Sequence, residues 1–246
     1  MKDVLKKSLF ITAIIVVLLL IGFNTYRLLN GINEYKKGNS TYDDIKQQVV
    51  NNSVEPGKTD VDRVDFNRLK AINPDVVGWL SMKDTVIDYP VVKGNDNEYY
   101  LNHLYTGEWN SLGTLFVDFR NYDLFTDRNT VIYGHSMLNG SMFFILEKYE
   151  KQSFYEEHKE FLFETPDKKY KLLPFAGKIM DGKEAFVEFD FDSDDDFYNY
   201  IDYFIRNSTF RSDVEFTAQD KVVMMIKCSD DFEDARYVLL CKVEEL

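Results

Sequence analysis

The chain has 246 residues, of which 45% are hydrophobic and 15% aromatic, so it can form one substantial domain with a packed core plus an extension. Its formal net charge of −13 argues against a nucleic-acid-binding protein, which would carry a basic face. Acidity of this kind indicates solubility and does not identify a substrate.

The N-terminus carries an apolar run preceded by three lysines. Residues 9–23 are almost all apolar, and although this is shorter than the roughly 20 residues of a membrane span, flanking apolar residues can extend it. A cleaved signal peptide is the alternative, but residues 24–27 lack its small-residue cleavage pattern. We predict a cytoplasmic tail over residues 1–7, an uncleaved single-pass anchor over residues 8–29, and the remainder outside the cell.

The next segment is polar. Residues 30–62 are predicted to form a spacer between membrane and domain, with a break in the pattern at residues 38–40. After that break, residues 42–50 predict a helix capped at Ser40 or Thr41. Residues 64–72 predict a second short helix, which ends before Asn73-Pro74.

From residue 76 onward the pattern changes to short β-rich runs separated by polar turns. Many short strands at this spacing indicate a closed or nearly closed barrel. The predicted strands are residues 76–82, 85–92, 113–119, 129–134, 160–164, 169–178, 185–191, 214–217, 221–228 and 236–243.

Two segments interrupt the strands with helical periodicity. They are residues 142–149 and 194–205, each with apolar side chains on one face. The acidic residues around 190–196 resemble a calcium loop, but the sixth position is Asp195 rather than glycine and the twelfth is Ile201 rather than glutamate. We interpret these carboxylates as complementing the dipole of a helix N-terminus.

Three chemically active side chains stand at predicted strand ends. Cys228 ends one apolar run, Arg236 begins the next after a seven-residue polar loop, and His135 ends the run from residue 130. The two later runs predict a β-hairpin. A thiol, an imidazole and a guanidinium are the nucleophile, proton carrier and oxyanion partner that acyl transfer requires.

The second cysteine serves as an internal comparison. Cys241 lies in mid-strand between apolar residues and is predicted to be core. In the hairpin register that pairs Cys228 with Arg236, Cys241 faces roughly residue 223. The two sulfurs would then be on the order of 15 Å apart, too far for a disulfide.

With these residues in view, the chain resembles the class B sortases, which are membrane-anchored cysteine transpeptidases of Gram-positive bacteria. The resemblance runs from about Arg68 to the C-terminus, and its blocks keep the family's order and spacing. The matching blocks are residues 72–80, 85–91, 96–102, 113–121 and 129–135.

The resemblance implies a mainly β fold with helices. This is an eight-stranded sortase barrel with an N-terminal helical extension and a long helix between the sixth and seventh strands, here residues 194–205. The catalytic domain would cover residues 63–246. The implied reaction is attack by a cysteine thiolate on a carbonyl within a C-terminal sorting motif of the LPxTG-like or NPxTN-like kind. A thioacyl-enzyme forms, and a cell-wall or pilin amine releases it.

The resemblance also implies the residue roles. Cys228 would be the nucleophile, His135 the general acid and base, and Arg236 the group that holds the substrate and stabilises the oxyanion. Asn102 and Ser229 match positions of the substrate groove less securely. The partners would be surface proteins with a sorting signal, an amine acceptor and the membrane.

One position departs from the family's Thr-Leu-x-Thr-Cys block. Lys227 stands where the family has threonine before the nucleophile. Strand alternation directs Lys227 away from the face of Cys228, and we expect its side chain to be exposed to solvent.

The other two histidines are interpreted as structural. His158 lies in a charged surface segment, and His103 follows Asn102 as a bystander. Three histidines and two cysteines at these spacings match no zinc site, so no metal and no cofactor are predicted.

Two alternatives stay open at this point. One is a cysteine peptidase that hydrolyses the same intermediate, and the other is an inactive surface scaffold on the same fold, suggested by Lys227. The exact motif, the cargo, the acceptor and the oligomeric state are open as well.

Overall fold

The structure, a computed structural model, describes residues 2–51, 63–137, 139–182, 187–217, 219–228 and 235–246. Its helices are α1 (Lys2–Val49), α2 (Phe66–Ile72), α3 (Gln152–Glu157) and α4 (Asp194–Arg206), with 3-10 helices η1 (Tyr99–Leu101) and η2 (Phe143–Glu150). Its strands are β1 (Val76–Ser81), β2 (Asp88–Val92), β3 (Leu115–Val117), β4 (Asn129–His135), β5 (Phe161–Glu164), β6 (Lys169–Asp181), β7 (Val222–Cys228) and β8 (Ala235–Glu245).

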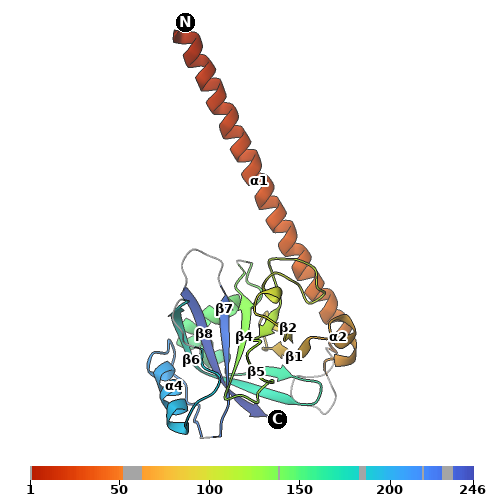
Figure 1. Cartoon of the computed structure of the whole chain (residues 1–246), viewed down its shortest axis with the longest axis vertical. Coiled ribbons are helices and arrows are strands. Elements are labelled where there is room, and N and C mark those ends of the chain that lie inside the picture. The colour runs from red at the N-terminus through yellow and green to blue at the C-terminus, as the bar shows by residue number, and fades with distance from the viewer. Residues whose placement is uncertain (1, 52–62, 138, 183–186, 218, 229–234) are drawn as a thin grey trace.

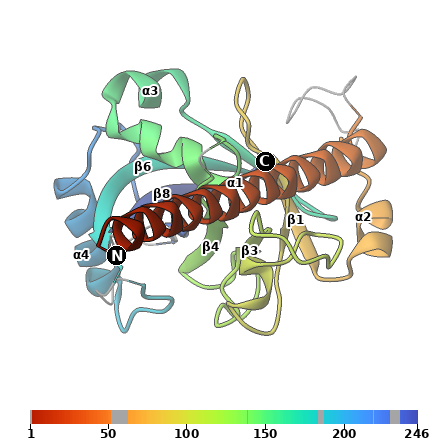
Figure 2. The same ribbon diagram turned by 90° about the horizontal axis from the view of Figure 1, so that it is seen from above.

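These strands form a closed mixed barrel in the order β1-β2-β3-β4-β7-β8-β6-β5. The pairs β2–β3 and β4–β7 are parallel, and the remaining neighbours are antiparallel. The helices α2 and α4 lie on opposite sides of the barrel in both ribbon views (Figure 1, Figure 2). The predicted eight-stranded barrel is therefore confirmed.

The central strands are buried on both faces. All seven residues of β4 are buried, as are Val222–Ile226 of β7, because helices and loops cover the outside of the barrel there. Large aromatic side chains such as Trp79, Phe116 and Phe163 fill the core. Such a core holds the ends of β4 and β7 in fixed positions.

Two of the predicted strands are wrong in the described part. Residues 187–191 and 214–217 are irregular, and the rest of the first run lies outside the described residues. Residues 187–191 nevertheless lie along the barrel, since the carbonyls of Phe189 and Glu188 accept bonds from the backbone and side chain of Asn129.

Both predicted helical interruptions exist. α4 begins after Ser193, whose hydroxyl caps the amide of Asp196, and three aspartates fill its first turn, as the dipole favours. The other segment is the 3-10 helix η2 rather than an α-helix. It follows Met142, whose φ of 55° places it in the left-handed region and sets the direction in which η2 starts.

α1 is a single helix whose N-terminal part projects away from the barrel (Figure 1). The predicted break at residues 38–40 and the cap at Ser40 or Thr41 are wrong, because α1 continues to Val49. Glycine suits position 38 because α1 lies very close to Leu112 here. A Cβ atom on residue 38 would be only 2.8 Å from Cδ2 of Leu112. That packing outweighs the roughly 1 kcal/mol that a glycine costs inside a helix.

The two ends of α1 have different surroundings. Leu9–Leu29 present exposed apolar side chains, and in the described chain this helix is long and apolar enough to cross a membrane. Further on, Tyr42, Ile45 and Val49 are buried against the barrel. Part of the segment that the sequence assigns to a spacer thus packs on the domain.

One end of the barrel faces the side from which α1 projects. β8 ends beside the C-terminus, at the end of the domain opposite to the projecting helix (Figure 1). β7 runs antiparallel to β8, and β4 runs parallel to β7. The last residues of β4 and β7 therefore lie at the end nearer the projecting part of α1.

Candidate active site

His135 and Cys228 are the last residues of adjacent parallel strands. The β4–β7 ladder runs from Asn129 opposite Val222 to His135 opposite Cys228. Neighbouring strands lie about 4.8 Å apart, so the two backbones are close enough for an imidazole and a thiol to meet. The side chain of Cys228 lies outside the described part of the structure.

Arg236 enters the same region from β8. The β7–β8 pairing runs from Val222 opposite Lys242 to Ile226 opposite Val238. Two further residues in that register bring Arg236 opposite Cys228. Arg236 is half-buried and pairs on its other side with Met180 of β6. The backbones of Cys228, His135 and Arg236 thus come together at one end of the barrel.

The predicted hairpin register is confirmed by Cys241. This residue lies opposite Val223, as the register that pairs Cys228 with Arg236 requires, and it is a free, fully buried cysteine. Burial raises the pKa of the Cys241 thiol well above its ordinary value. A thiol held neutral in the core is a poor nucleophile.

The imidazole of His135 is held from the opposite side of the site. It is only 6% exposed, and its Nε2 atom lies 2.6 Å from the carbonyl oxygen of Leu101 at the end of η1. A carbonyl oxygen only accepts, so Nε2 carries a proton and donates it.

The loop behind His135 depends on Gly113. This residue has a φ of +61°, and a Cβ on it would lie 2.6 Å from the carbonyl oxygen of Tyr100 and 2.7 Å from that of Leu101. The same Cβ would be 3.0 Å from Cδ2 of His135. Only glycine tolerates both the left-handed backbone and this close approach.

A second supporting contact comes from α1. The Tyr42 hydroxyl donates to the carbonyl oxygen of Gly113 at 2.5 Å and lies 2.8 Å from Oγ1 of Thr114. Neither Gly113 nor Tyr42 was singled out as a functional residue from the sequence. A glycine at the start of the predicted strand 113–119 was the available signal for Gly113, whereas no local pattern marks Tyr42.

Of the two weaker candidates for the substrate groove, Asn102 lies in the described part of the structure and Ser229 does not. Asn102 directly follows Leu101, is exposed, and accepts the amide of Asn110 at its carbonyl oxygen. It therefore lies next to the residue that holds His135. Ser229 lies outside the described residues, as do residues 183–186 of the segment before α4.

The expected exposure of Lys227 is wrong. Its side chain is only 13% exposed and forms an ion pair with Glu147 of η2. Lys227 stands opposite Gly134 in the β4–β7 ladder, one residue before the His135–Cys228 pair. Alternation along the strand therefore directs it to the face covered by η2, away from that of Cys228.

The remaining histidines have structural partners. The His103 ring stacks on Tyr99 at 3.9 Å, and its Nδ1 lies 2.7 Å from the carbonyl oxygen of the same residue. The His158 ring stacks on Phe154, whose carbonyl oxygen lies 3.1 Å from its Nδ1. Within the described residues, no three His, Cys, Asp or Glu side chains gather in a way that could hold a metal ion.

Comparison with known proteins places this geometry in context. No protein-family model matches the chain. It is 32% identical to sortase B of Staphylococcus aureus over 97% of this chain and 98% of that protein. It is also 32% identical to sortase B of Listeria monocytogenes, over 98% of both chains.

Solved structures agree with these similarities. A Staphylococcus aureus sortase B–substrate complex superposes with a TM-score of 0.75 at 31% identity, covering 87% of this chain and 99% of that one. A sortase B complexed with triglycine gives a TM-score of 0.70 at 36% identity, over 74% and 86% of the two chains.

Proposed function

This chain belongs to the class B sortases, which are cysteine transpeptidases, and from that premise we propose its specific reaction and the residues that perform it. The substrate is a surface protein that carries an LPxTG-like or NPxTN-like sorting motif near its C-terminus. The enzyme cleaves a peptide bond in that motif through a thioacyl intermediate. It then transfers the acyl group to an amine of the cell wall or of a pilin.

The nucleophile in this proposal is Cys228. Its thiolate attacks the carbonyl carbon of the scissile bond and forms a C–S bond, and the carbonyl electron pair moves onto the oxygen. When the tetrahedral intermediate collapses, the C–N bond breaks and a thioester remains. An incoming amine then attacks the thioester, and the thiolate of Cys228 leaves.

His135 moves the protons in both halves of the reaction. It protonates the leaving amine and later accepts a proton from the attacking amine. Because Nε2 is bonded to the Leu101 carbonyl, we assign this transfer to Nδ1. The bond to Leu101 also limits rotation of the ring, so Nδ1 keeps one direction throughout the cycle.

Arg236 stabilises the negative charge. Its guanidinium is permanently cationic and presents several donors in one plane, which suits both an oxyanion and the substrate backbone. Arg236 lies at the start of β8, and the hairpin register places it opposite the end of β7. This position supports the assignment. Asn102 and Ser229 are weaker proposals for contacts to the substrate.

We propose that residues 8–29 cross the membrane once, with residues 1–7 in the cytoplasm and the domain of residues 63–246 outside. The long exposed apolar part of α1 supports this arrangement. Sorting signals and wall amines meet on the outer face, so the topology agrees with the reaction. A relative solved with triglycine supports a glycine-like amine as the acceptor to test first.

The observation that carries the proposal is the pairing of His135 with Cys228 at the end of two parallel strands. The full-length chain in detergent, incubated with sorting peptides of both kinds and triglycine, should give a peptide–triglycine product. Cys228→Ala should abolish it. Cys241→Ala is the matched control, since a buried neutral thiol takes no part, and that variant should keep its transfer activity once its folding is verified.

The outcome of the peptide assay separates transfer from hydrolysis. We expect the transfer product to dominate when triglycine is present, with hydrolysis slow in its absence. A product mixture that is unchanged by triglycine would identify a hydrolytic peptidase instead. Cleavage that survives Cys228→Ala would contradict the assigned nucleophile.

A further inference from the structure

The two tryptophans of the chain have opposite surroundings. Trp79 is completely buried in the barrel, whereas Trp109 is 65% exposed. Trp109 pairs through an isolated bridge with His103, whose ring stacks on the partly exposed Tyr99. Trp109 and Tyr99 are thus two exposed aromatic residues that are connected through His103.

The loop that carries Trp109 is fixed against α1. The amide of Ser111 donates to the Glu34 carboxylate at 2.7 Å, and the Asn110 side chain donates to the carbonyl oxygen of the same residue at 3.0 Å. Lys37 forms a 3.0 Å ion pair with Glu108. These contacts place Trp109 at the level of residues 34–37 along the helix.

That level is close to the end of the apolar part of α1. Leu28 and Leu29 are the last apolar residues of the predicted span, and Ile32 adds one more exposed apolar side chain. A helix rises 1.5 Å per residue, so Glu34 lies only about 7.5 Å beyond Leu29. The interfacial layer on each side of a bilayer is roughly 5–8 Å thick. A tilt of α1 toward the side that carries this loop would bring the loop still closer to the lipid.

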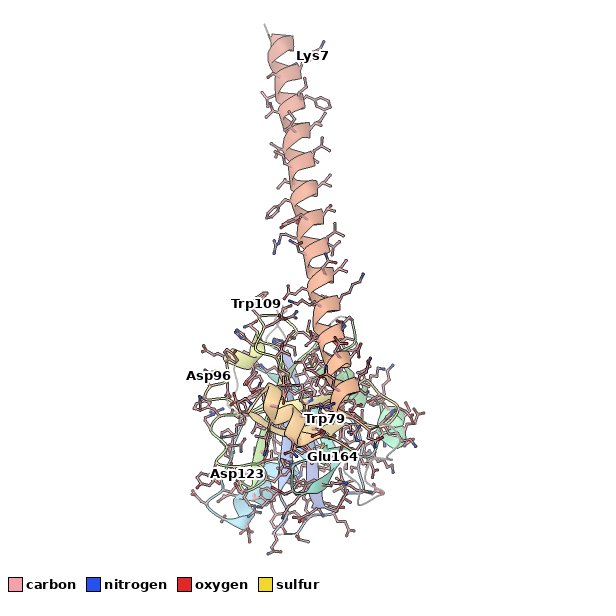
Figure 3. All side chains as sticks on the ribbon, turned by 90° about the vertical axis from the view of Figure 1, so that its right-hand side faces the viewer. Lys7, Trp79, Asp96, Trp109, Asp123 and Glu164 are labelled. Carbon is pink, nitrogen blue, oxygen red and sulfur yellow. The ribbon has the colours of Figure 1, made fainter. Side chains whose placement is uncertain are left out.

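We propose that Trp109, together with Tyr99, inserts into the lipid headgroup layer of the membrane that α1 crosses. Tryptophan and tyrosine favour this layer because their rings are apolar and their N–H or O–H groups still reach water. Trp109 lies at the end of the domain nearest the projecting part of α1 (Figure 3). The partner is the lipid surface, and the inference rests on the proposed anchor.

Charge complementarity does not supply this contact. The chain has a net charge of −13 and is not attracted to anionic headgroups. The aromatic pair would therefore bind through its apolar rings, and vesicles of zwitterionic phosphatidylcholine are sufficient as a probe. Because the ends of β4 and β7 lie at the same end of the domain, the contact would hold the candidate active site close to the membrane.

Fluorescence quenching tests the proposal on the full-length chain in phosphatidylcholine vesicles. Bromine atoms placed near the headgroup end of the acyl chains should remove most of the Trp109 emission, and acrylamide in the water should remove little. In Trp109→Phe the remaining emission comes from the buried Trp79. Neither quencher should change it appreciably.

A relocated tryptophan provides the matched control. Tyr122 is 87% exposed and neighbours Asp123, which lies at the end of the domain away from α1 (Figure 3). In the double variant Trp109→Phe/Tyr122→Trp, the new indole should be quenched by acrylamide and insensitive to brominated lipid.

Three outcomes would overturn the inference. If the protein resists alkaline extraction from the vesicles but acrylamide quenches Trp109, the anchor stands and the lipid contact is wrong. If alkali releases the protein, the anchor fails and the inference fails with it. If Trp109 becomes protected only when a sorting peptide is added, it contacts substrate rather than lipid.

Discussion

At the scale of single residues, the candidate site depends on backbone groups as much as on side chains. His135 is held by a carbonyl oxygen of η1, and that carbonyl is in turn packed against Gly113. The supporting groups in both contacts, the Leu101 carbonyl and the Gly113 backbone, are parts of the main chain that no side-chain motif displays. The sequence therefore identifies the candidate reactive residues, whereas contacts with the main chain hold His135 in its position.

Replacing Gly113 with alanine should damage both stability and activity. The left-handed backbone costs roughly 1–2 kcal/mol for a non-glycine residue, and the clash with the carbonyl oxygens of Tyr100 and Leu101 displaces the loop behind His135. We expect about tenfold or more loss in kcat/KM, since a misplacement near 1 Å has large effects on catalysis. Urea unfolding and peptide-transfer kinetics measure the two effects.

Gly140→Ala is the matched control for this prediction. Gly140 has a φ of +88°, but a Cβ there would meet nothing within 4 Å. It carries the backbone strain without the clash, so the variant should be destabilised and still keep most of its kcat/KM. Equal losses of kcat/KM in both variants would contradict the role assigned to Gly113.

Asp118 should make stability depend on pH below about 4. Burial acts to raise the pKa of its carboxyl, but the side-chain and backbone bonds from Arg120 outweigh burial and hold that pKa below its ordinary value near 3.9. Because the folded-state pKa is depressed, the stabilisation is fully present above about pH 4. It is lost as pH falls through the folded-state pKa.

Asp118→Asn tests this dependence. The variant should be less stable than the parent at pH 7, and the difference in unfolding free energy should shrink between pH 4 and pH 3. Glu157→Gln, at an exposed position, should follow the parent curve throughout. A constant difference between the parent and Asp118→Asn across this range would refute the assignment.

At the scale of secondary-structure elements, α1 contributes more than a connection to the membrane. Its C-terminal part buries Tyr42 and Ile45, and the Tyr42 hydroxyl bonds the loop that supports His135. An element outside the barrel therefore contributes to the position of a residue in the site. Packing of α1 on the loop is the physical connection between the two.

Tyr42→Phe should weaken that connection. Removing the hydroxyl leaves the buried carbonyl oxygen of Gly113 without this donor, which costs about 1–3 kcal/mol. We expect lower stability in urea and a lower kcat, because the loop behind His135 becomes less constrained. In Tyr122→Phe, where the ring is exposed, both quantities should stay close to those of the parent.

At the scale of the whole molecule, a buried ionic group joins the segment before α2 to the barrel. Arg63 donates from Nε to the Glu164 carboxylate at 2.9 Å, and it also contacts Asp88 and Ser81. These partners belong to β5, β2 and β1. Arg63 thus connects three neighbouring strands of the closed barrel.

Arg63→Met should cost about 3–5 kcal/mol of stability, because Glu164 is left buried and uncompensated. The double variant Arg63→Met/Glu164→Met should recover most of that loss, since no isolated charge remains. Lys168→Met, which breaks an exposed pair with Glu245, should leave the urea midpoint almost unchanged. A double variant as unstable as Arg63→Met would contradict this account.

Features that depend on neighbours along the chain were predictable without the structure. Short β-rich runs predicted the main strands, the hairpin that pairs Cys228 with Arg236 predicted that Cys241 lies opposite residue 223, and helical periodicity predicted α4. These predictions succeeded because a strand that is buried on both faces is a short apolar run, and because an amphipathic helix repeats its buried side chains about every 3.6 residues.

Contacts between distant segments became known only from the folded chain. The barrel places His135 beside the backbone of Cys228, α1 continues through Gly38 onto Leu112, and Lys227 pairs with Glu147. Each of these depends on packing between elements far apart in sequence, and no local periodicity encodes such contacts. The strand order of the closed barrel brings β4 next to β7 and thereby sets the backbone geometry of the site.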